Sequence, residues 1–291
     1  MSPQNRQPMP PIDAEPQAEA QAASHASVAC AASHDPRPLG VVVLGRGSSG
    51  AAAREQLQAL AEPLRALLPE ARIAIAFADR ASPSLPEALT QCLPCRQIIV
   101  QPLFLPGENA LLRWLEKVAQ RWRHQQGSGA EALAALPPIV FAPGIWQQAA
   151  LPELLARQID QAQALPDVTQ TTPERWQHDP AAWSTIPPHQ RHALLCLGPR
   201  CTALGAAALW PQLTERLRAC GKLQRGVMAL QTSCQYPCNH GPLMIVYPDG
   251  IWYGRLDEDA IAHIVDEHLQ HGRPLAQYRI HRNGEEPAGG A

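Results

Sequence analysis

The chain has 291 residues, of which 45% are hydrophobic, and its formal net charge is -2 at pH 7. This length and hydrophobic content suffice for two modest cores, and a near-neutral charge without a clustered basic run argues against nucleic acid as the main partner. No apolar run of about eighteen residues is present, so neither a membrane span nor a membrane partner is expected.

The two ends of the chain differ in composition from the rest. Residues 1–36 are rich in Ala, Gln, Pro and Glu and predict a disordered tail, and residues 283–291 form a second, short tail. The N-terminal stretch has neither the charged start nor the apolar segment of a signal peptide. We therefore expect a cytoplasmic protein, whose reduced cysteines are available as metal ligands instead of disulfides.

The first expected strand, Leu39–Leu44, leads into Gly45-Arg46-Gly47-Ser48-Ser49-Gly50 and an Ala-rich helix that ends near Leu68. This order fits the glycine fingerprint of dinucleotide-binding folds. The acidic residue that such folds place on the ribose would be Asp79, which lies 29 residues after Gly50, whereas about twenty is usual. The region also has room for only about four strands, too few for a full dinucleotide-binding sheet. The sequence therefore favours another use of this loop.

Three motifs follow one another between residues 37 and 165. They are Gly45-Arg46-Gly47-Ser48, Ala81-Ser82-Pro83-Ser84-Leu85-Pro86-Glu87-Ala88-Leu89 and Ile98-Ile99-Val100-Gln101-Pro102-Leu103-Phe104-Leu105-Pro106-Gly107. In this order they resemble the small class II chelatases, the sirohydrochlorin cobalt- and ferrochelatases of the CbiX/SirB type. The resemblance continues through Pro137–Gly144 and a helix at Leu151–Ala164. It implies a parallel α/β sheet flanked by helices and insertion of a divalent metal into a tetrapyrrole. Because only one unit is present, it also implies a homodimer.

The chain departs from that family at two positions. Members carry a histidine in the first motif and another after the glycine of the third, where this chain has Arg46 and Asn109. Metal insertion needs a ligand for the ion and a base for the pyrrole protons, and neutral histidine serves as either. Arginine stays protonated and has no acceptor. The replacements therefore favour a domain that binds without inserting metal.

Arg46, Ser48 and Asn109 are the candidate substrate-binding residues, because arginine binds carboxylates through paired N–H groups and sirohydrochlorin-type macrocycles carry several carboxylates. Glu87 is the candidate catalytic base, and Glu108 is a second carboxylate with the same capacity. Each has a simpler interpretation, Glu87 as an acid in the first turn of a helix and Glu108 as an exposed loop residue. If the chain is an enzyme, we expect a metal chelatase, which is a lyase.

Cys92 and Cys95 form a Cys-x-x-Cys pair between an expected helix and the strand at Ile98. Such a pair serves as a redox dithiol or as half of a zinc site. No second pair lies nearby in the sequence, so two unligated thiols are the favoured interpretation.

Four cysteines in the last third of the chain form two close pairs, Cys196 with Cys201 and Cys234 with Cys238. Two loops with two cysteines each can bring four thiolates to one pocket, as iron–sulfur clusters require. A four-cysteine zinc site is the alternative, although zinc sites favour the shorter Cys-x-x-Cys spacing. The spacing alone leaves both open.

The residues around these pairs predict an alternation of strands and helices. We expect strands at His192–Cys196, Gly226–Leu230 and Leu275–Ile280, a strand–turn–strand over Gly241–Gly254, and helices over Thr202–Cys220 and from Asp257 onward. Cys220, late in the first of these helices, is interpreted as a buried or half-buried free thiol.

The stretch Gly241–Gly254, with Cys-Leu-Gly-Pro-Arg-Cys ahead of it, resembles the thioredoxin-like [2Fe-2S] ferredoxins over about residues 190–282. The resemblance implies a thioredoxin-like α/β fold and a [2Fe-2S] cluster as cofactor. The metal ligands that it implies are Cys196, Cys201, Cys234 and Cys238. It further implies one-electron transfer with a redox partner protein, often by a dimer.

The sequence therefore predicts five segments: a tail (1–36), a chelatase-like domain (37–165), a linker (166–189), a ferredoxin domain (190–282) and a second tail (283–291). Trp176 and Trp183 lie in the linker and are expected to dock it against a domain. We expect an electron-transfer protein whose chelatase-like domain docks a tetrapyrrole or a tetrapyrrole enzyme. Two alternatives are an active sirohydrochlorin chelatase of siroheme or cobalamin synthesis with an accessory cluster, and a non-catalytic sensor or adaptor that responds to iron or redox state.

Overall fold

The computed structural model describes residues 35–48, 50–127, 129–171 and 178–285, and leaves out the side chains of Ala182 and Trp183. The expected N-terminal tail up to residue 34, Trp176 and the last six residues lie outside the described residues. No helix in the described part is long and apolar enough to cross a membrane.

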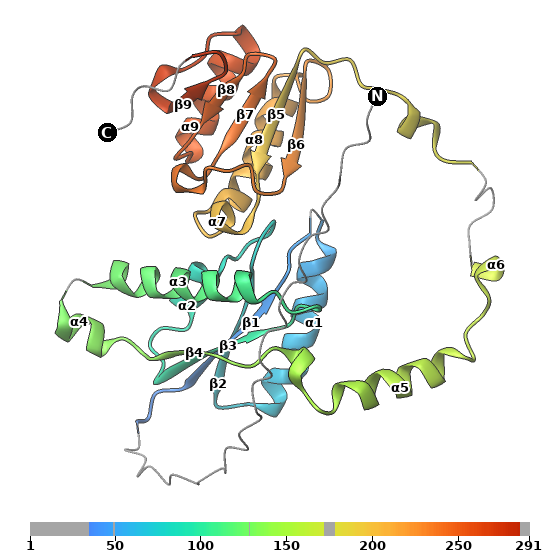
Figure 1. The fold of residues 1–291 in the computed structure, drawn as a ribbon, viewed down its shortest axis with the longest axis vertical. Coiled ribbons are helices and arrows are strands. Elements are labelled where there is room, and N and C mark those ends of the chain that lie inside the picture. Colours follow the sequence, from blue (N-terminus) through green and yellow to red (C-terminus); the bar gives the residue numbers. More distant parts are fainter. Residues whose placement is uncertain (1–34, 49, 128, 172–177, 286–291) are drawn as a thin grey trace, which may run out of the picture. The chain divides into compact units, whose positions relative to one another are not determined.

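The first sheet has four parallel strands in the order β2-β1-β3-β4 (Figure 1). Its strands are β1 (Leu39–Gly45), β2 (Ala71–Phe77), β3 (Gln97–Pro102) and β4 (Ile139–Phe141). The helices that connect and follow them are α1 (Ala52–Leu67), α2 (Leu85–Gln91), α3 (Asn109–Gln126), α4 (Ala130–Ala135) and α5 (Leu151–Ala162). A short turn η1 (Ile145–Gln147) precedes α5, and α6 (Val168–Thr171) and η2 (Ala181–Ser184) follow it.

Strand β1 is buried on both faces, which explains its continuous apolar run. Val42 and Leu44 enter a core shared with α2 and α3, whereas Val41 and Val43 enter a core shared with α1. Successive side chains of a strand point to opposite faces, so helices must cover both sides of the sheet. The expected parallel α/β sheet flanked by helices is confirmed.

The second sheet has five strands in the order β6-β5-β7-β8-β9, with β5 parallel to β6 and the other pairs antiparallel. Its strands are β5 (Arg191–Cys196), β6 (Val227–Thr232), β7 (Met244–Tyr247), β8 (Ile251–Tyr253) and β9 (Arg279–Arg282). Its helices are α7 (Pro199–Thr202), α8 (Ala206–Ala219) and α9 (Glu258–His263), with further helical turns η3 (Cys238–His240), η4 (Ile264–Leu269) and η5 (Ala276–Tyr278). Helices α8 and α9 contact each other and share the core of this sheet.

Two elements differ from the sequence-based expectation. The helix expected over Thr202–Cys220 is interrupted, because Gly205 takes a φ of 91° that favours glycine and α8 begins only after it. The strand expected at Leu275–Ile280 begins later, at Arg279. The reason is that the backbone N–H of Leu275 donates to the Tyr253 hydroxyl (3.1 Å) and the next residues form the turn η5.

The last helix carries a buried polar group in a π-helical turn. His268, fully buried in η4, hydrogen-bonds through Nδ1 to the Tyr253 hydroxyl at 2.8 Å. Its Nε2 lies 3.5 Å from Asp249 Oδ2, without a hydrogen-bond partner among the described residues, and Asp249 is itself paired with Arg191. Burial lowers the pKa of His268 below its ordinary value of 6.5, although Asp249 opposes this shift. The imidazole is therefore neutral in the folded chain near pH 7.

We expect the free energy of unfolding to fall as the pH drops below about 6.5, because the unfolded chain then binds a proton that folded His268 does not. The loss reaches at most about 1.4 kcal/mol per pH unit for one proton. Urea unfolding between pH 7.5 and 5 measures this slope. His268→Gln should flatten it, whereas His263→Gln, at an exposed position of α9, should not. Equal slopes for the unaltered chain and His268→Gln would contradict the assignment.

Candidate metal centre

The two cysteine pairs lie at the carboxyl ends of two neighbouring parallel strands. Cys196 is the last residue of β5, and its register partner is Thr232, the last residue of β6. Cys201 follows in α7, while Cys234 and Cys238 follow β6. Because parallel strands end at the same edge of a sheet, the two ligand loops meet there.

Two glycines allow the ligand loops to approach each other. A Cβ at Gly198 would lie 2.9 Å from the Cα of Cys234, and a Cβ at Gly241 would lie 3.0 Å from the Sγ of Cys201. A side chain at Gly198 would therefore push the loops apart. Sequence analysis did not single out either glycine as part of the centre, although both stand close to a cysteine in the sequence.

The four thiols lie in one cluster with one exposed member. The Sγ atoms of Cys234 and Cys238 are 3.2 Å apart, and the Cys196 Sγ lies 3.5 Å from the backbone oxygen of Ser233. Cys196 and Cys201 are each 1% exposed and Cys238 is 8% exposed, whereas Cys234 is exposed. The centre is thus buried on the side of the sheet and open to solvent beside Cys234.

The pKa values of three of the four thiols are shifted, in different directions. A hydrogen bond from the Cys201 thiol lowers the pKa of Cys196 to about 6, aided by the backbone N–H groups of Gly198 and Gln235. The same hydrogen bond and burial raise the pKa of Cys201. Burial, and then the Cys234 thiol, raise the pKa of Cys238 to about 11. Four thiolates together would need the charge of bound metal, because three of these groups already oppose one another's ionisation.

The four cysteines reach the candidate centre as two pairs, each on its own loop. Among the described residues, no group of three or more His, Cys, Asp or Glu side chains is arranged to hold a metal ion. Backbone N–H groups directed at sulfur are also a feature of iron–sulfur sites, where they tune the reduction potential.

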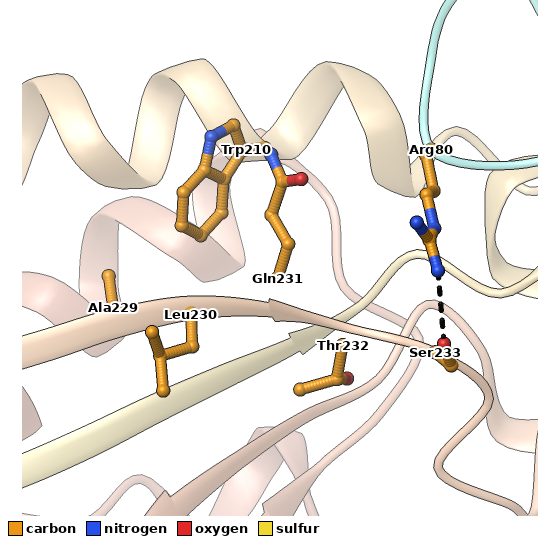
Figure 2. Close-up of a pocket in the computed structure, with 7 residues that line it drawn as sticks. All are labelled: Arg80, Trp210, Ala229, Leu230, Gln231, Thr232 and Ser233. Atoms are coloured by element: carbon orange, nitrogen blue, oxygen red, sulfur yellow. Dashed lines mark hydrogen bonds between the residues drawn. The ribbon is translucent and has the colours of Figure 1, made fainter. Parts of the chain in front are cut away.

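Arg80, which sequence analysis did not single out, contacts both ligand loops. Its backbone N–H donates to the Leu197 carbonyl (3.2 Å) and to Thr202 Oγ1 (3.1 Å), and its Nη2 donates to Ser233 Oγ at 3.3 Å (Figure 2). Its φ of 60° lies in the left-handed region. The only sequence signal is its place in a polar loop after β2, which says nothing of a contact with residues more than a hundred positions away.

The candidate binding residue Arg46 is held by carboxylates of its own chain. Its Nε and Nη2 donate to the two carboxylate oxygens of Asp79 (3.1 and 2.6 Å), and Nη1 pairs with Glu108. Asp79 is only 3% exposed. Burial works against the charge of Arg46, but the two carboxylates raise its pKa above the ordinary value. A ligand carboxylate could therefore bind Arg46 only by displacing one of these partners.

The loop around Arg46 is packed against Asp79. The Gly47 N–H donates to Asp79 Oδ1 at 3.3 Å, and a Cβ at Gly47 would lie 2.1 Å from the Asp79 backbone oxygen. Ser48 is half-buried with its hydroxyl 3.4 Å from the Gly50 carbonyl, and Asn109 is the exposed first residue of α3. The acid that a dinucleotide fold would offer to a ribose is thus engaged with Arg46.

Glu87, the candidate base, has a structural task. Its Oε2 accepts hydrogen bonds from the backbone N–H (2.6 Å) and hydroxyl (2.7 Å) of Ser84, which is the capping box at the start of α2. Such a box supplies partners for backbone N–H groups that the first helical turn leaves free. The structure therefore supports the simpler interpretation of this residue.

The remaining described cysteines are free thiols. Cys92 and Cys95 are fully buried, and burial raises the pKa of Cys92 to about 11 and raises that of Cys95 as well. Buried neutral thiols are poor nucleophiles and poor metal ligands. Cys220 is half-buried against the core of the second sheet, as expected.

Comparison with known proteins finds similar proteins for both parts of the chain, the part with the first sheet and the part with the second. The sequence pattern of the CbiX family matches residues 40–162. The later part of the chain is similar to a 2Fe-2S ferredoxin of Aquifex aeolicus, with 28% identity over 98 residues, which is 31% of this chain and 88% of that protein. It is also similar to a candidate 2Fe-2S ferredoxin of Priestia megaterium, with 30% identity over 92 residues, 32% of this chain and 71% of that protein.

This chain is also similar to a solved structure of the CbiX type. It is a candidate cobalamin (vitamin B12) biosynthesis CbiX protein of Marinobacter aquaeolei, which is 25% identical to this chain. The match covers 43% of this chain and 98% of that one, with a TM-score of 0.36.

Proposed function

Because this chain belongs to the 2Fe-2S ferredoxin family through its later part and joins that part to a CbiX domain, we propose that it is an electron-transfer protein with one [2Fe-2S] cluster. The proposed ligands are Cys196, Cys201, Cys234 and Cys238. The observation that carries the proposal is the meeting of the two cysteine pairs at one sheet edge, with the two thiols after β6 only 3.2 Å apart.

The residues around the centre suit that role. A bound [2Fe-2S] cluster supplies a one-electron couple whose potential depends on hydrogen bonds to sulfur and on exposure. The N–H groups of Gly198 and Gln235 are directed at Cys196 and stabilise negative charge there. Cys234 provides the exposed side on which a redox partner protein can approach. The buried side, with Cys196 and Cys201, keeps solvent from the cluster.

We assign the first sheet and its helices, residues 37–165, to docking a tetrapyrrole or a tetrapyrrole enzyme, with residues 166–189 as the linker to the ferredoxin domain at 190–282. The match to the CbiX family supports a tetrapyrrole-related role for this domain. The proposed protein is a cytoplasmic homodimer, since one CbiX unit per chain offers half of a two-unit site.

Metal insertion by the CbiX domain is the second candidate, and the family match favours it. Two observations count against it. Arg46 is tied to Asp79 and Glu108, and an arginine can neither ligate a metal nor accept a proton. Glu87, the candidate base, is occupied in the cap of α2.

One preparation tests both candidates. The full chain purified anaerobically should contain about two irons and two labile sulfides and take up one electron per chain. Offered sirohydrochlorin with cobalt, it should bind the macrocycle without inserting the metal. Colourless protein with stoichiometric zinc after anaerobic iron–sulfur reconstitution would refute the cluster, and brisk insertion would establish the chelatase instead.

A further inference from the structure

A cavity of about 340 Å³ lies between helix α3 and the loops that carry the cysteines. Trp114, Arg121 and Trp122 of α3 line one side, and Arg200, Leu204 and Cys238 line the other. Its volume falls at the lower end of the range for small-molecule sites. It therefore suits a compact ring system better than a whole tetrapyrrole macrocycle.

The cavity has two arginines whose donors are not used within the chain. Neither Arg121 nor Arg200 makes a hydrogen bond or ion pair with any described residue, and none of the described residues that line the cavity is acidic. Asp and Glu would compete with an anion for the guanidinium groups, as Asp79 and Glu108 do at Arg46. The cavity thus has two arginines and no carboxylate among its described lining residues, and Arg200 also acts on the Cys238 thiol.

The aromatic wall is fixed in place. The Arg200 guanidinium lies 5.9 Å from the centre of the Trp114 ring, a cation–π contact that leaves its N–H groups free to bond an oxygen. Trp122 is 3% exposed and donates from Nε1 to Thr90 Oγ1 at 3.0 Å. Flat apolar surface next to guanidinium groups is the surface on which an aromatic ring with an attached anion binds.

We propose that this cavity binds a planar aromatic anion of about the size of a flavin ring system, with its ring against Trp114 and its phosphate or carboxylate at Arg121 and Arg200. This site goes beyond the proposed electron transfer and does not require it. Because Cys238 forms part of the wall, a bound ring would lie beside a residue that we assign to the cluster.

The test titrates the full chain, purified anaerobically, with flavin mononucleotide and with riboflavin, which has the same ring and no phosphate. Calorimetry should show the mononucleotide binding roughly tenfold more tightly, the effect of one charge-assisted hydrogen bond. Arg200→Gln and Trp114→Leu should each weaken the mononucleotide by roughly tenfold. Arg113→Gln, an exposed position on the same helix outside the cavity, is the matched control and should leave the affinity unchanged.

Arg121→Gln provides a second variant outside the cysteine loops, in case Arg200→Gln disturbs them. Equal affinity for both flavins, or binding that survives Arg121→Gln and Trp114→Leu, would overturn the proposal. Competition by inorganic phosphate at the same affinity would also do so, because the site would then select the anion alone. The visible spectrum separates the two proposals: a coloured protein without flavin binding contradicts only this one, and a colourless protein that binds the mononucleotide contradicts only the cluster.

Discussion

Changing Cys196 or Cys201 to serine is expected to abolish the visible absorption of the protein and most of its iron. Both thiols are 1% exposed and stand on the same loop, so water cannot complete the coordination in their place. Serine keeps its proton near neutral pH, and iron–sulfur centres select soft thiolate ligands. Cys238→Ser should behave similarly, while Cys234→Ser should lose less, because this thiol is exposed and solvent can reach the vacated position. Iron and sulfide content after anaerobic purification measures the effect.

Cys220→Ser is the matched control, since Cys220 is a half-buried free thiol after α8, packed against the core of the same domain, and this variant should retain full iron content. Cys92→Ala and Cys95→Ala test the first sheet in the same way. Because metal binding contributes to folding free energy, the ligand variants should also melt at lower temperature than Cys220→Ser. Loss of iron from Cys220→Ser, or full iron in Cys201→Ser, would contradict the ligand set.

Most of the fold was predictable because local sequence patterns determine its strands and helices. The apolar run of β1 and the alternation of strands and helices around the cysteines identify the sheets, and the structure confirms both. What local patterns did not predict is how helices end and bend. The break at Gly205 and the π-helical turn around His268 depend on a backbone angle and on the packing of one imidazole against Tyr253. Neither leaves a periodic signal.

The cysteine pairs were found from spacing alone, because two residues of one loop must lie close together. The environment of Arg46 was not, since Asp79 stands 33 positions away and Glu108 stands 62 away. Sequence analysis predicted that Arg46 binds a carboxylate of the ligand, whereas in the structure it binds Asp79 and Glu108 of its own chain. The contact of Arg80 with the ligand loops was missed for the same reason. Long-range pairs of charges need the topology, which brings the carboxyl ends of parallel strands together.

Replacing Arg46 by alanine is expected to lower the free energy of unfolding by roughly 2–4 kcal/mol, because it leaves the Asp79 carboxylate buried without its partner. Asp79 is 3% exposed, and its carboxylate would retain, among the described residues, only the Gly47 N–H at 3.3 Å. Arg46 is 36% exposed on its side chain, which keeps the expected loss at the lower part of the range for buried pairs. Urea unfolding of the two proteins at pH 7 gives the difference.

A double-mutant cycle with Asp79→Asn separates the pair from the two single residues. The asparagine side chain in that variant carries no charge, so Arg46→Ala should cost much less in that background, and the difference is the coupling of the pair. Glu108→Gln is the exposed comparison, and we expect it to cost at most about 1 kcal/mol. If Arg46→Ala instead left stability unchanged and weakened sirohydrochlorin binding, Arg46 would be directed at the ligand and not at Asp79. Whether Arg46→Ala lowers the stability or the affinity for sirohydrochlorin therefore decides whether the loop after β1 maintains the fold or binds the macrocycle.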